Sequence, residues 1–241
     1  MNDTNATPTG GWRRHLDVAA TVLVILTCGA LLWRTFGSQG TPTPRPEPPL
    51  PSEPVSIEGA ATTGSLEALA VMIVFSEFEC PFCASFAKDT WPTLLRDYVE
   101  PGRLLVAYRH FPLEQIHPNA VAAGKAVECA SRENQFWQMH NVLFDQPRPL
   151  DPGQFPGMAA NLGLDPMAFD LCMLQDAETR VRADMAEGRT LGVSGTPTFF
   201  FGRRAGAHEV TILSRLTGAK PVAEFNAAID GLLEGRAIAL R

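Results

Sequence analysis

The chain has 241 residues, of which 45% are hydrophobic and 19% are charged, and its formal net charge is −6. This composition is typical of a globular protein with a sizeable core, and the length fits one such domain with an N-terminal appendage. Because there is no excess of basic residues, nucleic acid is not an expected partner.

The N-terminal appendage contains a long apolar run from Leu16 to Trp33, with arginines on both sides. A helix of this length spans about 27 Å, which is close to the thickness of a bilayer core. We expect residues 16–36 to form an uncleaved transmembrane anchor after a cytoplasmic tail of residues 1–15. A cleaved signal peptide, or a lipoprotein signal around Cys28, is the alternative. The flanking positive charges nearly balance, so they do not fix the orientation.

Prolines dominate residues 37–56. Such a composition predicts an extended, semi-rigid spacer between the anchor and the folded domain, and the alternative is a disordered tail. We place the folded domain at residues 57–241.

The first half of the folded domain reads as strand, helix, strand. Val71–Phe75 is an apolar run that predicts a buried strand. The next segment, Ala84–Tyr98, has a helical pattern that Pro92 is expected to kink. Leu104–Tyr108 then reads as a second strand.

A helical block follows over about 118–192, where glycine, proline and aspartate separate several amphipathic segments. The predicted helices are Asn119–Ser131, Gln135–Phe144, Gln154–Leu162, Asp165–Leu174 and Glu178–Leu191. The chain then returns to strands at Thr198–Phe201 and His208–Leu213, and it closes with an amphipathic helix over Pro221–Glu234.

The motif with the clearest chemistry is Cys80-Pro81-Phe82-Cys83, which lies between the predicted strand and helix. The first turn of a helix carries unpaired N–H groups and partial positive charge, so it stabilises a thiolate at Cys80. Cys83, one turn later, would resolve mixed disulfides, and Pro81 suits the first helical turn. The alternatives are half of a zinc site, or two inert buried thiols. No second CxxC or HxxxH accompanies the motif, which disfavours a metal.

Four segments in order resemble DsbA-like thiol-disulfide oxidoreductases of the thioredoxin superfamily. They are FSEFECPFC (75–83), YRHFPL (108–113), FWQMH (136–140) and GVSGTPTFF (192–200). The resemblance runs from about Ile57 to Leu233. It implies an α/β class, with a thioredoxin fold interrupted by a helical insertion over about 118–192.

The resemblance also assigns roles to residues. Cys80 is the implied nucleophile and Cys83 the resolving cysteine. Pro197 is the implied cis-proline, and the backbone of Thr196 before it would pair with a bound client. X-Pro bonds reach the cis state at modest cost, and the alternative for Thr196-Pro197 is an ordinary turn. The Thr196 hydroxyl could also reach the sulfur. No cofactor and no metal are implied.

Two departures from the family pattern bear on the redox potential. Strongly oxidising relatives often carry histidine where this chain has Phe82, which cannot donate a hydrogen bond to the thiolate. We therefore expect a less depressed Cys80 pKa and a less extreme potential. The strand before the motif also lacks the buried acid that some relatives keep there. Glu77 and Glu79 are nearer candidates for proton transfer, and the alternative is that both are solvated loop carboxylates.

Cys129 and Cys172 both fall in the helical block. In an oxidising compartment a remaining even pair favours a structural disulfide, and the alternative is two small buried side chains. His110, His117 and His140 do not form a metal motif; packing explains His140, and capping of a helix start explains His117.

Together with the apolar N-terminal segment, the resemblance implies a bacterial, single-pass membrane protein whose catalytic domain lies on the periplasmic or extracytoplasmic side, where disulfides persist. We expect it to pass its disulfide to reduced or unfolded exported clients through a mixed disulfide, and to be reoxidised by a membrane redox partner. The alternatives are a reductase or isomerase that uses the same site, and a client-binding, chaperone-like module.

Overall fold

The computed structural model describes residues 11–36, 47–175 and 177–235, and it divides the chain into two compact units, Met1–Glu47 and Pro48–Arg241. In the first unit, helix α1 covers Gly11–Phe36. Its window Val18–Thr35 has a mean hydropathy of 1.8, which makes it long and apolar enough to cross a membrane. The helix begins at Gly11, inside the segment predicted as a cytoplasmic tail, and residues 1–10 lie outside the described residues.

The second unit is built on a six-stranded sheet with the order β1-β6-β5-β3-β4-β2. The strands are β1 (Val55–Ser56), β2 (Ala61–Thr63), β3 (Ala70–Ser76), β4 (Leu104–His110), β5 (Thr198–Arg204) and β6 (Glu209–Thr217). The central strand β3 pairs in parallel with β4 and antiparallel with β5. Every residue of β3 and β4 is buried, which explains the apolar runs Val71–Phe75 and Leu104–Tyr108 within them.

Alternate residues of β3 face two different hydrophobic cores. Met72 and Val74 belong to the larger core, which also contains most of the helices. Val71, Ile73 and Phe75 face the smaller core on the other side of the sheet. Because successive strand side chains point to opposite faces, one strand anchors both layers.

The helical segment after β3 runs from Pro81 to Val99 without leaving helical geometry. It consists of α2 (Pro81–Ser85), the π-helical turn η1 (Phe86–Thr90), α3 (Trp91–Leu94) and the π-helical turn η2 (Leu95–Val99). The segment thus begins at Pro81, three residues before the predicted start at Ala84. Pro92, the residue predicted to kink this helix, lies in the first turn of α3, directly after the π-helical turn η1.

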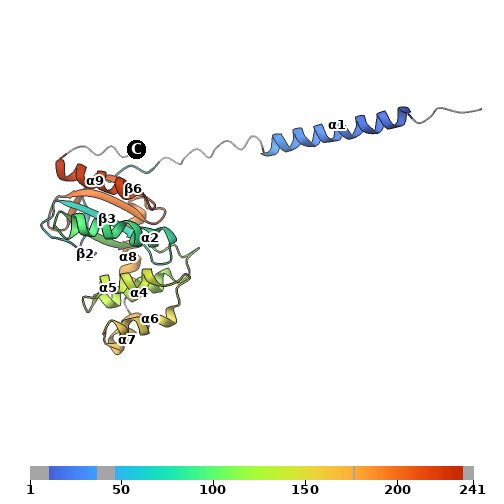
Figure 1. Ribbon diagram of the computed structural model, residues 1–241. Coiled ribbons are helices and arrows are strands. Elements are labelled where there is room, and N and C mark those ends of the chain that lie inside the picture. Colours follow the sequence, from blue (N-terminus) through green and yellow to red (C-terminus); the bar gives the residue numbers. More distant parts are fainter. Residues whose placement is uncertain (1–10, 37–46, 176, 236–241) are drawn as a thin grey trace, which may run out of the picture. The chain divides into compact units, whose positions relative to one another are not determined.

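The predicted helical insertion is present between β4 and β5 (Figure 1). It comprises α4 (Ala120–Ser131), α5 (Phe136–Asp145), the short 3₁₀ turn η3 (Pro152–Gln154), α6 (Phe155–Asn161), α7 (Pro166–Leu174) and α8 (Ala177–Thr190). The last helix, α9, covers Val222–Glu234 and packs on β5 and β3. The α/β class and the inserted helices are therefore confirmed.

The structure corrects the boundary between linker and domain. The predicted linker 37–56 includes strand β1, whose Val55 pairs with Val210 of β6. Further upstream, Arg215 donates a hydrogen bond to the carbonyl oxygen of Pro49 at 3.1 Å. The folded unit consequently begins at Pro48, and residues 37–46 of the predicted linker lie outside the described residues. The short strands β1 and β2 were not predicted.

Candidate active site

The CxxC motif lies where the chain passes from β3 into α2. Cys80 is the N-cap residue of α2, and Pro81 occupies the first turn, where no N–H partner is needed. The carbonyl oxygen of Cys80 accepts a hydrogen bond from the backbone N–H of Ala84 at 3.1 Å, which closes the first helical turn. Cys80 is therefore held at the positive end of a helical segment, as the sequence predicts.

The loop that precedes β5 contacts the Cys80 sulfur. Since β5 pairs with β3, with Thr198 opposite Phe75, the loop before β5 meets the loop after β3. The Thr196-Pro197 peptide bond is cis, and the Cys80 thiol donates to the carbonyl oxygen of Thr196 at 3.3 Å. The sequence-predicted residues Cys80, Thr196 and Pro197 are thus brought together from distant parts of the chain.

The two cysteines have opposite electrostatic environments. A hydrogen bond from Cys83 is the largest cause that lowers the pKa of the Cys80 thiol, to about 5; the Thr196 hydroxyl and the backbone N–H groups of Cys83 and Phe82 lower it further. Burial raises the pKa of Cys83 well above its ordinary value, and the neighbouring Cys80 adds to this effect. At neutral pH the reduced pair therefore consists of a Cys80 thiolate and a Cys83 thiol.

Phe82 projects its ring toward solvent. The residue is 61% exposed, whereas both cysteines are buried. Its contribution to the Cys80 pKa comes from its backbone N–H and not from the ring. An exposed aromatic ring beside a reactive sulfur provides an apolar contact surface at the site.

Glu77 is buried next to the reactive sulfur. Burial is the main cause that raises the pKa of its carboxyl group to about 8, and the charge of Cys80 raises it further. The ring nitrogen Nδ1 of His117 contacts the Glu77 carboxylate. His117 was expected to cap a helix; the side chain instead pairs with Glu77, and the N-cap residue of α4 is Asn119.

Glu79 is also buried, but its carboxylate joins two loops. It accepts hydrogen bonds from the backbone N–H of Asn119 at 2.7 Å and from that of Leu150 at 2.9 Å. Neither Glu77 nor Glu79 is a solvated loop carboxylate, because only 1% and 4% of their surfaces are exposed. That alternative reading of the two acids is wrong.

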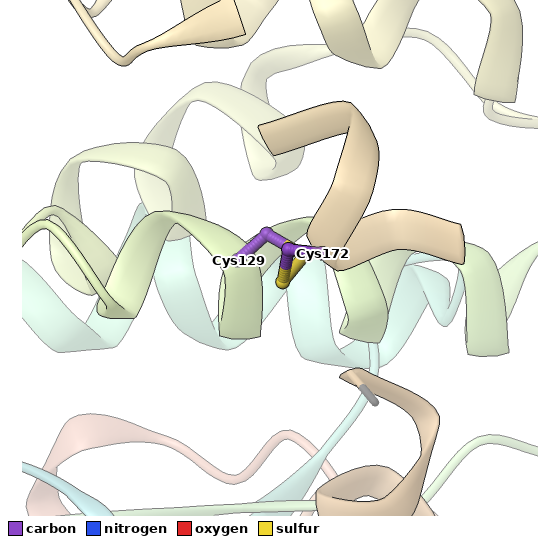
Figure 2. Close-up of a disulfide and its surroundings, with 2 residues drawn as sticks. All are labelled: Cys129 and Cys172. Carbon is purple, nitrogen blue, oxygen red and sulfur yellow. A yellow bond between two sulfur atoms is a disulfide. The ribbon is translucent and has the colours of Figure 1, made fainter. Parts of the chain in front are cut away.

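Cys129 of α4 and Cys172 of α7 form a disulfide, with their Cα atoms 5.7 Å apart (Figure 2). This bond links the first long helix of the insertion to a helix near its end. Both sulfurs are buried within the larger core, so the bridge lies inside the helical insertion and not at the CxxC.

Two further histidines lie in the core. His110 at the end of β4 places its Nε2 2.9 Å from the Glu128 carboxylate. His140 packs against the rings of Phe78, Tyr108 and Phe144, and burial lowers its pKa to about 4. Among the described residues, no three His, Cys, Asp or Glu side chains gather closely enough to hold a metal ion.

Sequence reasoning missed a group of residues around Cys83. Ser76, Tyr108 and His140 line a small cavity that the Cys83 side chain also borders. Ser76 offers a weak signal in the sequence, since it is the one hydroxyl residue that ends the apolar strand β3. Tyr108 and His140 lie far away in the chain, and only the fold brings them to the resolving cysteine.

Residues 56–230 match a family model described as thioredoxin. Among curated proteins, the Na⁺/H⁺ antiporter NhaA 1 of Salinispora arenicola is 36% identical over 165 residues, which cover 67% of this chain and 24% of the antiporter. The antiporter NhaA 3 of Salinispora tropica is 33% identical over 164 residues, with the same shares covered. The chain thus spans about a quarter of the length of these curated relatives.

Solved structures share the fold. Wolbachia pipientis α-DsbA1 superposes with a TM-score of 0.64 at 21% identity, over 77% of this chain and 94% of that protein. BdbD from Bacillus subtilis, in its oxidised form, gives a TM-score of 0.63 at 20% identity, over 77% of this chain and 98% of BdbD.

Proposed function

Because this chain belongs to the thioredoxin family of thiol-disulfide oxidoreductases, we propose that it introduces disulfides into client proteins through Cys80 and Cys83. The observation that carries the proposal is the contact between the Cys80 sulfur and the Thr196 carbonyl, at 3.3 Å, beside a cis-proline. Beside this contact, the Cys83 thiol, the Thr196 hydroxyl and two backbone N–H groups lower the pKa of Cys80 to about 5, whereas burial keeps Cys83 protonated.

The transfer of a disulfide proceeds in two balanced steps. A client thiolate attacks the Cys80 sulfur; the Cys80–Cys83 bond breaks, and its electron pair leaves on Cys83. A second client thiolate then attacks the client sulfur of the mixed disulfide. The client disulfide forms, and Cys80 leaves as a thiolate, which its low pKa favours.

The client would lie along the loop before β5. In this proposal the backbone of Thr196 pairs with an extended client segment, and the exposed ring of Phe82 contacts client side chains. Glu77 would exchange a proton at the site, because its pKa of about 8 lies near physiological pH. Glu79 instead holds the loops together through its hydrogen bonds.

Three observations support a membrane-tethered, extracytoplasmic location in a bacterium. Helix α1 contains a candidate membrane span. The Cys129–Cys172 disulfide is the kind of bond that persists in oxidising compartments. The similar stretch in the curated relatives is a part of proteins named as antiporters. A membrane protein that removes electrons from Cys80 and Cys83 would complete the cycle.

Two experiments on the full chain in detergent test this proposal. The oxidised protein should transfer its disulfide to a reduced, unfolded client, and Cys80→Ser should abolish the transfer. Offered a client that carries a disulfide, Cys83→Ser should be trapped as a mixed disulfide, because the Cys80 thiolate attacks that disulfide, one client sulfur leaves as a thiolate, and no Cys83 thiol resolves the product. Cys28→Ser is the matched control, because it removes an exposed cysteine outside the motif. A chaperone-like module would keep its activity in Cys80→Ser.

The direction of electron flow is tested by insulin reduction. If the protein catalyses reduction of insulin by a small dithiol faster than it oxidises a reduced client, the reductase reading replaces the oxidase reading. An isomerase would instead rescue a client with scrambled disulfides without added oxidant.

A further inference from the structure

A small cavity lies beside Cys83 in the larger core. The centre of a water molecule has about 10 Å³ available inside it. This is close to the space that one water molecule needs. Much of the wall is apolar, but it includes four polar side chains: Ser76, Cys83, Tyr108 and His140. A buried water usually requires two to four polar partners, which this set supplies.

The Tyr108 hydroxyl marks the cavity as a polar site. The side chain is buried, and its oxygen has no aligned hydrogen-bond partner among the described residues. A buried phenol without a partner is costly, so its hydroxyl is expected to bind a group in the cavity. Ser76 lines the same cavity as Tyr108 and Cys83, and its hydroxyl is close enough to both side chains to lower their pKa values.

We propose that Ser76, Tyr108 and one water molecule in this cavity form a hydrogen-bonding site that stabilises Cys83 as the leaving thiolate. The proposal rests on the proposed disulfide exchange. It assigns a catalytic role to Ser76, which touches the reacting sulfur, and a positioning role to Tyr108, which acts through Ser76 and the water. The ring of His140, which is uncharged at neutral pH, closes the cavity wall.

The need for such a site follows from the burial of Cys83. When a thiolate attacks Cys80, the Cys80–Cys83 bond breaks and the negative charge moves to the Cys83 sulfur. Only 1% of Cys83 is exposed, so bulk water does not solvate this charge. Hydroxyl groups fixed in place before the reaction can stabilise it without reorganisation.

The proposal separates rate from equilibrium. Cys83 is a thiolate only while the bond breaks, and it is a thiol in the reduced protein, because its pKa is raised well above neutral. Loss of the Tyr108 hydroxyl should therefore slow the exchange and leave the redox potential unchanged. A residue that only supports the fold would not produce this difference between rate and potential.

The test compares the two tyrosines of the chain. Tyr108→Phe removes the hydroxyl in the cavity. Tyr98→Phe is the matched control, because its hydroxyl donates to Asp230 at 3.1 Å, away from the cavity lining. The reaction of the oxidised full-length protein with reduced glutathione is followed by acid quenching and alkylation. We expect Tyr108→Phe and Ser76→Ala to react about tenfold more slowly at pH 7, whereas Tyr98→Phe reacts like the wild type.

Unchanged kinetics in Tyr108→Phe, or an equal loss in Tyr98→Phe, would overturn the inference. A high-resolution crystal structure with a dry cavity would also overturn it. Failure of the proposed function looks different, because the wild-type protein itself would then not exchange disulfides with glutathione.

Discussion

The pH dependence of the redox potential tests the electrostatics of the CxxC directly. Reduction of the disulfide takes up two electrons and as many protons as the reduced pair holds. The pKa of Cys80 is lowered from 9.0 to about 5, so its thiolate stabilises the reduced folded protein at higher pH. This stabilisation is lost as the pH falls through about 5, because the sulfur then takes up a proton.

The size of the effect follows from the same shift. At pH 7 the Cys80 thiol of ordinary pKa 9.0 would be protonated, whereas a thiol with a pKa of about 5 is ionised by a margin of about two pH units. Two units correspond to about 2.7 kcal/mol in favour of the reduced form. For a two-electron couple this is about 60 mV towards a more oxidising potential. The slope should be about −30 mV per pH unit above pH 5 and about −59 mV below it.

The assay is equilibration with glutathione buffers between pH 4 and pH 8, with the thiols trapped by alkylation. Thiolate absorbance near 240 nm in the reduced protein gives the Cys80 pKa independently. Cys83→Ala should raise that pKa, because it removes the hydrogen bond that lowers it most. A slope of about −59 mV per pH unit that continues to pH 8 would refute the reasoning, since it requires both sulfurs to be protonated.

Three further predictions concern other parts of the site and its support. Phe82→His adds a donor near the thiolate and should raise the potential by about 30 to 60 mV in the same glutathione assay; a lower potential would contradict this. Replacing both Cys129 and Cys172 by alanine should lower the free energy of unfolding by about 2–4 kcal/mol in urea while leaving the CxxC potential unchanged. Glu77 keeps its proton in the folded protein up to about pH 8, whereas the unfolded chain releases it near 4.5, so stability should fall as the pH rises between these values. Glu77→Gln should remove this loss, which amounts to at most about 5 kcal/mol; an unchanged pH profile of urea unfolding would contradict it.

The sequence predicted the elements that carry strong local patterns. The apolar run Val71–Phe75 became the core of β3, and Asn119–Ser131 became α4 within one residue. These segments are long or continuous, so their hydrophobic pattern alone identifies them. The strand β2, at Ala61–Thr63, has only three residues, and its pairing with β4 is decided by tertiary contacts. Local pattern contains no signal for such an edge strand.

The same distinction holds for the site. Cys80, Cys83 and Pro197 stand in recognisable motifs, and the structure brings them together. The contact of His117 with Glu77 was not foreseen, because the two residues are far apart in sequence and belong to no shared motif. The burial of Glu77 and Glu79 could not be predicted either. In the sequence both are loop residues next to the CxxC motif, and only the folded structure shows that they are buried.

The structure also reduces the contribution that we assign to Phe82 in setting the redox potential. The absence of a histidine there predicts a less depressed Cys80 pKa than in strongly oxidising relatives, but the groups that lower this pKa do not require a side-chain donor at that position. They are the Cys83 sulfur, the Thr196 hydroxyl and two backbone N–H groups, all fixed by the turn of α2 and the loop before β5. The Cys83 thiol and the Thr196 hydroxyl make the larger contributions, and the backbone donors at the helix N-terminus add to them whatever side chain stands at position 82. The side chain at position 82 therefore adjusts a potential that Cys83, Thr196 and the backbone of the first helical turn establish.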